Sequence, residues 1–180
     1  MPRHIAFPLL ALLVLSLSGS AWPASKAEID ARVSAALNAL YSAEPAAAEL
    51  GGKASGMLVF PRVYKLGAGL GGEYGEGVLM VDQQPVQYYK LVSASFGFSL
   101  GGQAKTEVLM FMTDESMRKF RESDGWEAGV DGSVAIVQFG VGKEVDTHSL
   151  KDPIIGFVFG NKGLMYDLSL EGSKFWQIQK

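Results

Sequence analysis

The chain of 180 residues contains no cysteine and only two histidines. The absence of cysteine excludes disulfides, thiolate metal sites, a cysteine nucleophile and acylation at an N-terminal lipobox cysteine. Positive charge is also scarce, because 16 Lys and Arg stand against 19 Asp and Glu and give a net charge of −3. This balance argues against nucleic acid as a partner, since nucleic-acid-binding proteins concentrate Lys and Arg.

The longest uncharged apolar run lies near the N-terminus, at residues 7–17, and is too short to span a bilayer. Arg3 and His4 precede it, and small residues follow it up to Ala21. This order of basic, apolar and small residues is typical of a secretory signal peptide. We therefore expect a signal peptide at residues 1–21 and a mature chain, residues 22–180, that is exported to the periplasm or secreted, and is peripheral to any membrane it contacts. The alternative is a retained membrane anchor.

The mature chain shows no linker or break in composition, so we expect one domain over residues 22–180. Glycine is abundant, with 22 residues, about twice its usual frequency. The glycines are interleaved with Val, Leu, Phe and Tyr rather than gathered in a low-complexity tract. Such spacing favours a β-rich domain with tight turns, bulges and close strand crossings.

Three helices are expected. Apolar residues spaced three and four apart predict an amphipathic helix over residues 26–41, with Ser25 as its N-cap. A second, short helix should begin at Pro45 and end at the glycine pair 51–52. Thr113 should cap a third helix that runs to about Ser123, with acidic residues in its first turn and basic residues near its end.

Elsewhere the apolar residues alternate with polar or small ones, which predicts strands. We expect a short strand 57–60 stopped by Pro61, a glycine-rich strand 66–82, a turn at 83–85, and strands at 92–101, 108–112, 126–131 and 134–141, followed by a hairpin of 154–159 and 164–170 joined through 160–163. The fold class is α+β: an N-terminal amphipathic helix or helices, then a glycine-rich antiparallel sheet with one inserted helix. A sheet of this size either curls into a barrel or splits into a sandwich, and periodicity does not decide between them.

Motifs for catalysis or cofactors are weak. Residues 67–72 match the glycine spacing of a dinucleotide fingerprint, but no helix signal follows, so we interpret them as twisted β structure. His148 stands in a turn-like stretch without a triad context. The acidic residues Glu73, Glu76, Glu107 and Asp131 are interpreted as outward polar positions rather than a glycosidase pair. We expect no enzyme activity, no metal and no cofactor.

Cations near the first predicted strand suggest a binding site. Lys53, Arg62 and Lys65 bracket an apolar segment, and a bend at Pro61 could bring them together. Basic residues beside apolar surface suit an anionic lipid head group and its acyl interface. The alternative is that they are ordinary surface cations, and none of the three is expected in the core.

Several segments resemble the SYLF domain, a lipid-binding family with actin-associated eukaryotic members and exported bacterial ones. The resemblance covers residues 26–175, and the segments that carry it are 53–61, Lys65, 71–79, Tyr89, 95–103, 107–110, 163–164 and 169–172. It implies phospholipid or phosphoinositide binding without catalysis or a cofactor. It also implies membrane contact through the N-terminal helix, where Arg32 supplies a cation and Val33 lies on the apolar face.

Three functional hypotheses follow. The first is an exported, non-enzymatic lipid-binding domain at the bacterial cell envelope, with phospholipid or an anionic membrane surface as its partner. The second is a structural or interaction module that contacts an envelope protein without specific lipid recognition. The third is a small hydrolase. Actin is not an expected partner, because an exported protein would not meet it.

Overall fold

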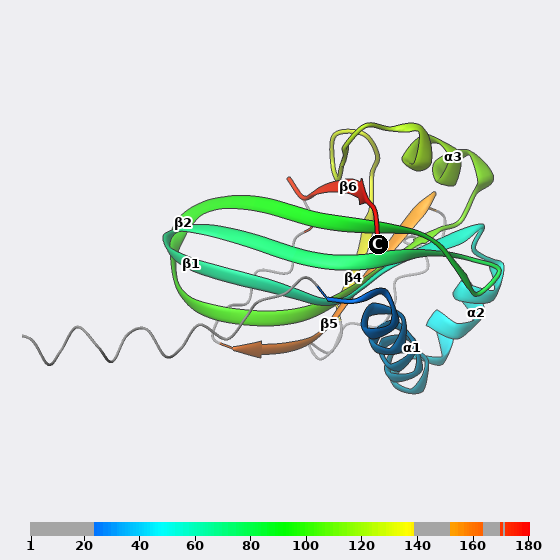
Figure 1. Ribbon diagram of the computed structural model, residues 1–180, viewed down its shortest axis with the longest axis horizontal. Coiled ribbons are helices and arrows are strands. Elements are labelled where there is room, and N and C mark those ends of the chain that lie inside the picture. Colours follow the sequence, from blue (N-terminus) through cyan, green and yellow to red (C-terminus); the bar gives the residue numbers. More distant parts are fainter. Residues whose placement is uncertain (1–23, 139–151, 164–169, 171) are drawn as a thin grey trace, which may run out of the picture.

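The computed structural model describes residues 24–138, 152–163, 170 and 172–180. Figure 1 shows a long, curled sheet with α1 and α3 on opposite sides of it. The predicted signal peptide at residues 1–21 and His148 lie outside the described residues. Within the described ranges, no helix has both the length and the apolar character needed to cross a membrane.

The first helix, α1, spans Lys26–Ala43 and confirms the prediction. The Ser25 hydroxyl caps it by accepting a hydrogen bond of 3.2 Å from the backbone N–H of Glu28. Its buried side chains, which face the sheet, are Ile29, Val33, Ala36 and Leu40. The apolar residues spaced three and four apart in the sequence therefore form the face of α1 that packs against the sheet.

The second helix, α2, spans Pro45–Lys53, and the expectation that it ends at the glycine pair 51–52 is wrong. A Cβ on Gly51 would lie 2.6 Å from the hydroxyl oxygen of Tyr41 in α1. Glycine at this position thus leaves room for the Tyr41 ring beside α2. That tertiary contact is invisible in a pattern that treats glycine as a helix stop.

Two very long strands dominate the sheet: β1, Gly56–Val81, and β2, Gln84–Phe111. They pair along their whole length, so the segments predicted as separate strands are continuous. The hairpin turn lies at Asp82 and Gln83, whose φ angles of 49° and 61° are those of a type I′ turn. The predicted turn at 83–85 was therefore displaced by about one residue.

Pro61 does not stop β1, contrary to the prediction. The register between β1 and β2 shifts between Phe60 and Val63, which places Pro61 in a bulge where its missing N–H is tolerated. The hydroxyl of Thr106 on β2 donates a hydrogen bond of 3.1 Å to the carbonyl oxygen of Pro61. The strand therefore pairs with β2 on both sides of the proline.

The β1–β2 ribbon bends back on itself, at the end drawn on the left of Figure 1, so that the two halves of β1 come into contact. A Cβ on Gly77 would lie 2.3 Å from the carbonyl oxygen of Val59, and one on Gly75 would lie 2.9 Å from a methyl carbon of Val63. Only glycine permits this approach. The predicted curling of the sheet is confirmed, and these glycines are part of its cause.

The shorter strands complete the sheet in the order β3-β6-β2-β5-β4. Their bounds are Trp126–Glu127 for β3, Ala135–Gln138 for β4, Ile154–Gly163 for β5 and Lys174–Ile178 for β6. The pairing of β4 with β5 is parallel, so the described sheet is mixed rather than wholly antiparallel. Strand β6 was not anticipated from the sequence.

Strand β5 runs through residues 160–163, so the predicted hairpin turn there is wrong. Gly160 has a φ of 68° and lies where the register between β2 and β5 shifts. The glycine that suggested a turn therefore marks a bulge. Most of the predicted partner strand, residues 164–169, lies outside the described residues.

The third helix, α3, spans Asp114–Glu122, as predicted. The Thr113 hydroxyl accepts a hydrogen bond of 3.1 Å from the backbone N–H of Ser116, and Gly125 adopts a φ of 94° just beyond the helix. Met117 and Phe120 are the apolar residues that α3 buries. Local capping signals were sufficient to define this helix.

Two apolar clusters hold the fold together, one on each face of the sheet. The inner core lies inside the curl and against α3, and it includes Leu58, Phe60, Leu79, Leu109, Phe111, Phe120, Trp126 and Phe175. The outer core lies between the sheet and α1 and includes Ile29, Val33, Leu40, Val59, Val78, Val108 and Phe157. The α+β class is confirmed.

Candidate functional site

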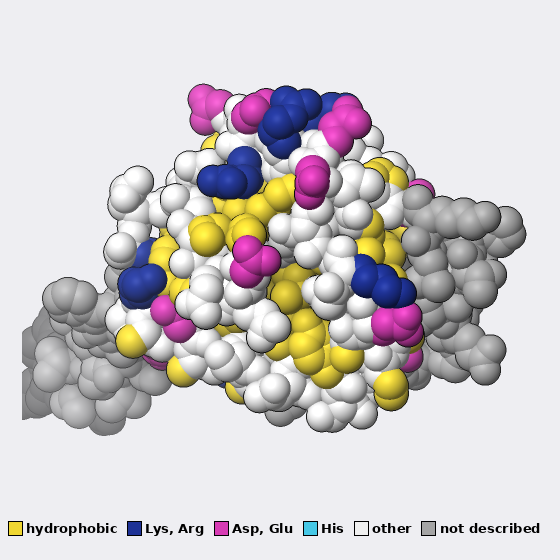
Figure 2. All heavy atoms as spheres, turned by 90° about the vertical axis from the view of Figure 1, so that its right-hand side faces the viewer, with side chains coloured by type: hydrophobic (Ala, Val, Ile, Leu, Met, Phe, Trp, Pro, Cys, Tyr) yellow, Lys and Arg dark blue, Asp and Glu magenta, His cyan; other side chains and the backbone are white. Residues whose placement is uncertain are grey.

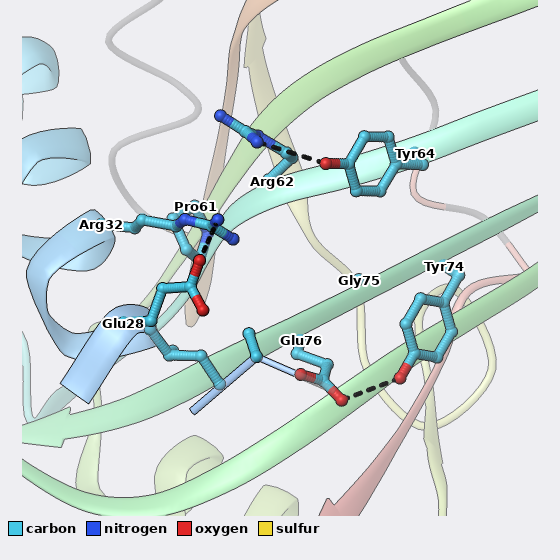
Figure 3. Close-up of a pocket in the computed structure, with 10 residues that line it drawn as sticks. Glu28, Arg32, Pro61, Arg62, Tyr64, Tyr74, Gly75 and Glu76 are labelled. Atoms are coloured by element: carbon cyan, nitrogen blue, oxygen red, sulfur yellow. Dashed lines mark hydrogen bonds and ion pairs between the residues drawn. The ribbon is translucent and has the colours of Figure 1, made fainter. Parts of the chain in front are cut away.

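A groove of 480 Å³ lies between the start of α1 and the place where the two halves of β1 meet. Figure 3 shows its lining, with Glu28 and Arg32 contributed by α1 and the other labelled residues by β1. The lining residues are Ala24, Glu28, Ile29, Arg32, Pro61, Arg62, Tyr64, Tyr74, Gly75 and Glu76. The bend in the ribbon is thus what assembles the groove.

Two arginines reach this groove from different elements. Arg32 extends from α1 toward Pro61 and forms an ion pair with Glu28, one helical turn before it (Figure 3). In the described part of the chain, Arg62 forms no ion pair. Its Nη1 atom donates a hydrogen bond of 3.2 Å to the hydroxyl of Tyr64. A guanidinium held this way keeps donors available for a carboxylate or phosphate.

The second half of β1 supplies a polar wall. The Tyr74 hydroxyl donates a hydrogen bond of 2.9 Å to Oε1 of Glu76, and Nζ of Lys180 lies 2.8 Å from the other oxygen of that carboxylate. Burial, together with the neighbouring Glu76 carboxylate, raises the pKa of Tyr74 to about 12. Tyr74 is therefore a neutral hydroxyl at physiological pH, and the charge of Glu76 is offset by the C-terminal lysine.

Exposed aromatic and apolar side chains surround the groove. Tyr64 is 49% exposed, Leu66 68% and Tyr74 48%. Arg62, Tyr64 and Leu66 alternate along one strand and so share its outer face. A tyrosine with a polar tip and an apolar ring suits the boundary between water and lipid. The groove thus combines cations with partly apolar surface.

The structure brings together two of the five residues predicted to bind lipid, Arg32 and Arg62. Lys53 lies at the end of α2, outside the groove lining, with its Nζ 2.6 Å from Oε1 of Glu49. Val33 is 1% exposed and packs in the outer core, which places it beneath the surface of α1. A polar substitution at Val33 would therefore act on folding before it acted on any ligand.

The expectation that Lys65 lies outside the core is wrong, because Lys65 is only 2% exposed. Residues three apart on a strand point to opposite faces, so an outward Arg62 requires an inward Lys65. The Nζ of Lys65 lies 3.0 Å from Oε1 of Glu73 in the other half of β1. This ion pair ties the two halves together on the inner face.

Lys65 belongs to a buried cluster of alternating charges, which we call the inner charge cluster: Lys65, Glu73, Lys105 and Glu107. The Nζ of Lys105 lies 2.9 Å from Oε2 of Glu73 and 2.9 Å from Oε1 of Glu107. All four side chains are almost fully buried. The interpretation of Glu73 and Glu107 as outward polar positions is therefore wrong, since each is held inside by a lysine.

Burial shapes the protonation of the cluster. It raises the pKa of Glu107 to about 7, although Lys105 acts in the opposite direction. Burial alone would lower the pKa of Lys105, but the charges of Glu107 and Glu73 outweigh it and the pKa of Lys105 is raised. Lys105 therefore stays charged, and Glu107 titrates close to neutral pH.

Other parts of the surface show a more even mixture of charge. Figure 2 shows the side of the molecule that bears α2 and α3, where basic and acidic side chains neighbour one another. Their pairs include Arg118 with Glu122 and Lys119 with Glu115, each at 2.8 Å and one helical turn apart. Arg62 differs from these cations because no described carboxylate neutralises it.

Tyr64, Tyr74 and Glu76 were not singled out as site residues from the sequence. The alternation of the strand could have placed Tyr64 beside Arg62, but only the bend in the ribbon brings Tyr74 there. The segment 67–72 lies within β1, which confirms its interpretation as β structure rather than a phosphate-binding turn. Within the described residues, no three His, Asp or Glu side chains are grouped to hold a metal ion.

Comparison with known proteins agrees with the resemblance seen in the sequence. Residues 92–180 match the model of a family described as Ysc84, Las17-binding protein actin regulator. This match covers β2 from Val92 onward and all the elements after it. No curated protein matches the chain. Together with the SYLF-like segments noted above, this match supports the assignment of the chain to the Ysc84, or SYLF, domain family.

Proposed function

We propose that this protein is a lipid-binding domain that holds an anionic phospholipid head group in the groove between α1 and β1. Family membership is consistent with a lipid-binding or an actin-related module. The observation that carries the lipid proposal is the convergence of Arg32 and Arg62 on one groove bordered by exposed tyrosine and leucine side chains.

Arg62 is the principal head-group contact in this proposal. Its guanidinium is exposed, and its described contacts are with the hydroxyl and the ring of Tyr64, the ring centroid lying 5.9 Å away. A phosphate entering the groove would accept charge-assisted hydrogen bonds from it. Arg32 contributes less, because part of its charge is already offset by Glu28.

The apolar part of the lipid would meet Tyr64, Leu66 and Tyr74. These side chains project from the same outer surface of β1 as Arg62, so one lipid or one membrane surface could touch all of them. Aromatic rings at the interface and a cation among the head groups are the usual division of contacts at a membrane surface.

We further propose that the domain is non-enzymatic and acts after export, at the cell envelope. The N-terminal residues 1–21 have the pattern of a secretory signal, which supports this location. The buried carboxylates Glu73 and Glu107 are engaged with lysines on the inner face rather than open to a substrate in the groove. These arrangements support binding over hydrolysis.

The family description names proteins, Las17 and actin, rather than lipids. A protein-interaction role at the envelope is therefore the alternative function. If it holds, the same groove would take an acidic peptide, and binding would not require a bilayer.

The test is co-sedimentation of the mature protein with phosphatidylcholine vesicles, prepared with and without phosphatidylglycerol. We expect binding only to the anionic vesicles, and we expect Arg62→Gln to weaken it about fivefold, as one cation near an anionic surface contributes roughly 1 kcal/mol. The matched control is Lys119→Gln, which removes an exposed, paired cation on α3 and should leave binding unchanged.

Three results would contradict the proposal. Absence of binding to anionic vesicles would favour the protein-interaction alternative. Equal binding to both vesicle types would show that the head group is not recognised. Loss of binding in Lys53→Gln equal to that in Arg62→Gln would show that the site is a broad surface that includes α2, as the sequence first suggested.

A further inference from the structure

The groove and the inner charge cluster occupy opposite faces of the same strand segments. On β1, Arg62 and Tyr64 face outward while Lys65 faces inward, and Tyr74 faces outward while Glu73 faces inward. On β2, Glu107 pairs in register with Phe60, and the next residues of β1, Pro61 and Arg62, line the groove. A change of charge at Glu107 therefore occurs directly behind the groove floor.

The strand segments between Glu107 and the groove are tied to each other. The Thr106 hydroxyl is hydrogen-bonded to the carbonyl oxygen of Pro61 at 3.1 Å, which ties the β2 segment that carries Glu107 to the β1 segment that lines the groove. Glu107 is completely buried. Water cannot surround its charge, so its field passes through a medium of low dielectric constant and is screened little by salt.

We propose that the inner charge cluster makes lipid binding at the groove depend on pH, with anionic lipid held more tightly when Glu107 is protonated. This inference rests on the proposed function of the groove. The reason is electrostatic. Protonation of Glu107 removes one negative charge behind the groove, so less repulsion opposes the attraction of the anionic head group to Arg62 and Arg32.

The groups that face Glu107 set where it titrates. Lys105 on its own strand lies 2.9 Å away, and Glu73 and Lys65 face it from β1. On β5 its register partner is Val158, which carries no charge. Burial dominates these influences and raises the pKa of Glu107 to about 7. The charge of Glu107 therefore changes between mildly acidic and mildly basic conditions.

The expected size of the effect follows from one unit charge placed behind the groove floor. In surroundings between protein and water, such a charge changes the affinity of an anion about fivefold. Affinity should therefore rise about fivefold as the pH falls from about 8 to about 5.5, with the midpoint near the pKa of Glu107. The phosphate of phosphatidylglycerol keeps its charge throughout this range.

The experiment measures binding to phosphatidylcholine vesicles with and without phosphatidylglycerol at both pH values, for the wild type and for Glu107→Gln. We expect the variant to bind equally at both pH values, with the affinity that the wild type shows at the lower one. His148→Gln, which removes the only histidine of the mature chain, should keep the change in affinity between the two pH values.

The inference would be overturned if Glu107→Gln kept the pH-dependent change in affinity, or if His148→Gln lost it. A wild type that binds anionic vesicles equally at both pH values would also overturn it and leave the proposed function standing. A wild type that ignores anionic vesicles at both would refute the proposed function itself. If Glu107→Gln does not fold, carboxyl NMR of the wild type replaces it: the titration midpoint of Glu107 must coincide with that of binding, and a mismatch contradicts the inference.

Discussion

The two faces of β1 between Arg62 and Glu76 use charge in opposite ways. On the outer face, Arg62 is exposed and interacts with a tyrosine hydroxyl at 3.2 Å. On the inner face, Lys65 and Glu73 are buried and paired at 3.0 Å with each other. The difference shows that an exposed charge is available for a ligand, whereas a buried one is committed to a partner that keeps it inside.

The same contrast applies to the energetics. Exposed pairs such as Lys53 with Glu49 contribute little to stability, because water and salt screen them. The inner charge cluster carries a large desolvation cost that its mutual attraction and hydrogen bonding must offset. Removing one charged residue from the inner charge cluster should therefore lower the free energy of unfolding far more than removing one from an exposed pair.

Lys105→Met should have the largest effect. Lys105 lies between two carboxylates, and its loss would leave Glu73 and Glu107 buried without the cation they share. We expect the free energy of unfolding to fall by about 3–5 kcal/mol, measured by urea denaturation. Lys119→Met, the exposed counterpart, should change it by less than about 1 kcal/mol. Similar losses in both variants would refute the contrast between the faces.

Gly77→Ala tests whether the inner contact between the halves of β1 is as close as the structure shows. The added carbon would lie 2.3 Å from the carbonyl oxygen of Val59, so we expect a loss of about 3 kcal/mol by the same measurement. Gly72→Ala is the control, because among the described neighbours its added carbon meets only the carbonyl oxygen of Ser93, at 3.6 Å. Equal tolerance at both positions would show that the halves do not pack this tightly.

The stability of the inner face should depend on pH in an unusual direction. The pKa of Glu107 is about 7 in the folded chain and near 4.5 when exposed, so folding favours its protonated form. Stability should therefore fall as the pH rises from about 4.5 to about 7, by about 2 kcal/mol between pH 5 and pH 8. Glu107→Gln should abolish this part of the dependence in denaturation curves. An unaltered dependence in the variant would assign it to other groups.

Arg62→Gln should have the smallest effect on folding. Its side chain is exposed and contacts only one neighbouring tyrosine among the described residues, so the free energy of unfolding should change by less than about 0.5 kcal/mol. Thermal denaturation of the variant used in the vesicle assay would check this. A large loss of stability would mean that Arg62 supports the fold, and its effect on lipid binding could not then be attributed to the head group.

Sequence predictions succeeded where a feature depends on residues close together in the chain and failed where it depends on distant ones. Helices α1 and α3 were found because Ser25 and Thr113 are capping residues and the apolar spacing is local. The predicted stops at Pro61 and at residues 160–163 failed because a bulge lets a long strand pass through them. Arg62 was correctly placed on an exposed surface, but the same alternation that exposes it should have placed Lys65 inside.

The class of the fold, its helices and the presence of a glycine-rich sheet can be predicted from the sequence alone, because they depend on periodicity and capping within a few residues of each other. Which charges meet depends instead on how the chain folds in three dimensions. Glu73 reaches Lys105 and Tyr74 reaches the groove because the β1–β2 ribbon bends double, and that bend depends on contacts such as Gly77 against Val59. Such contacts join residues distant in sequence, so no local pattern records them.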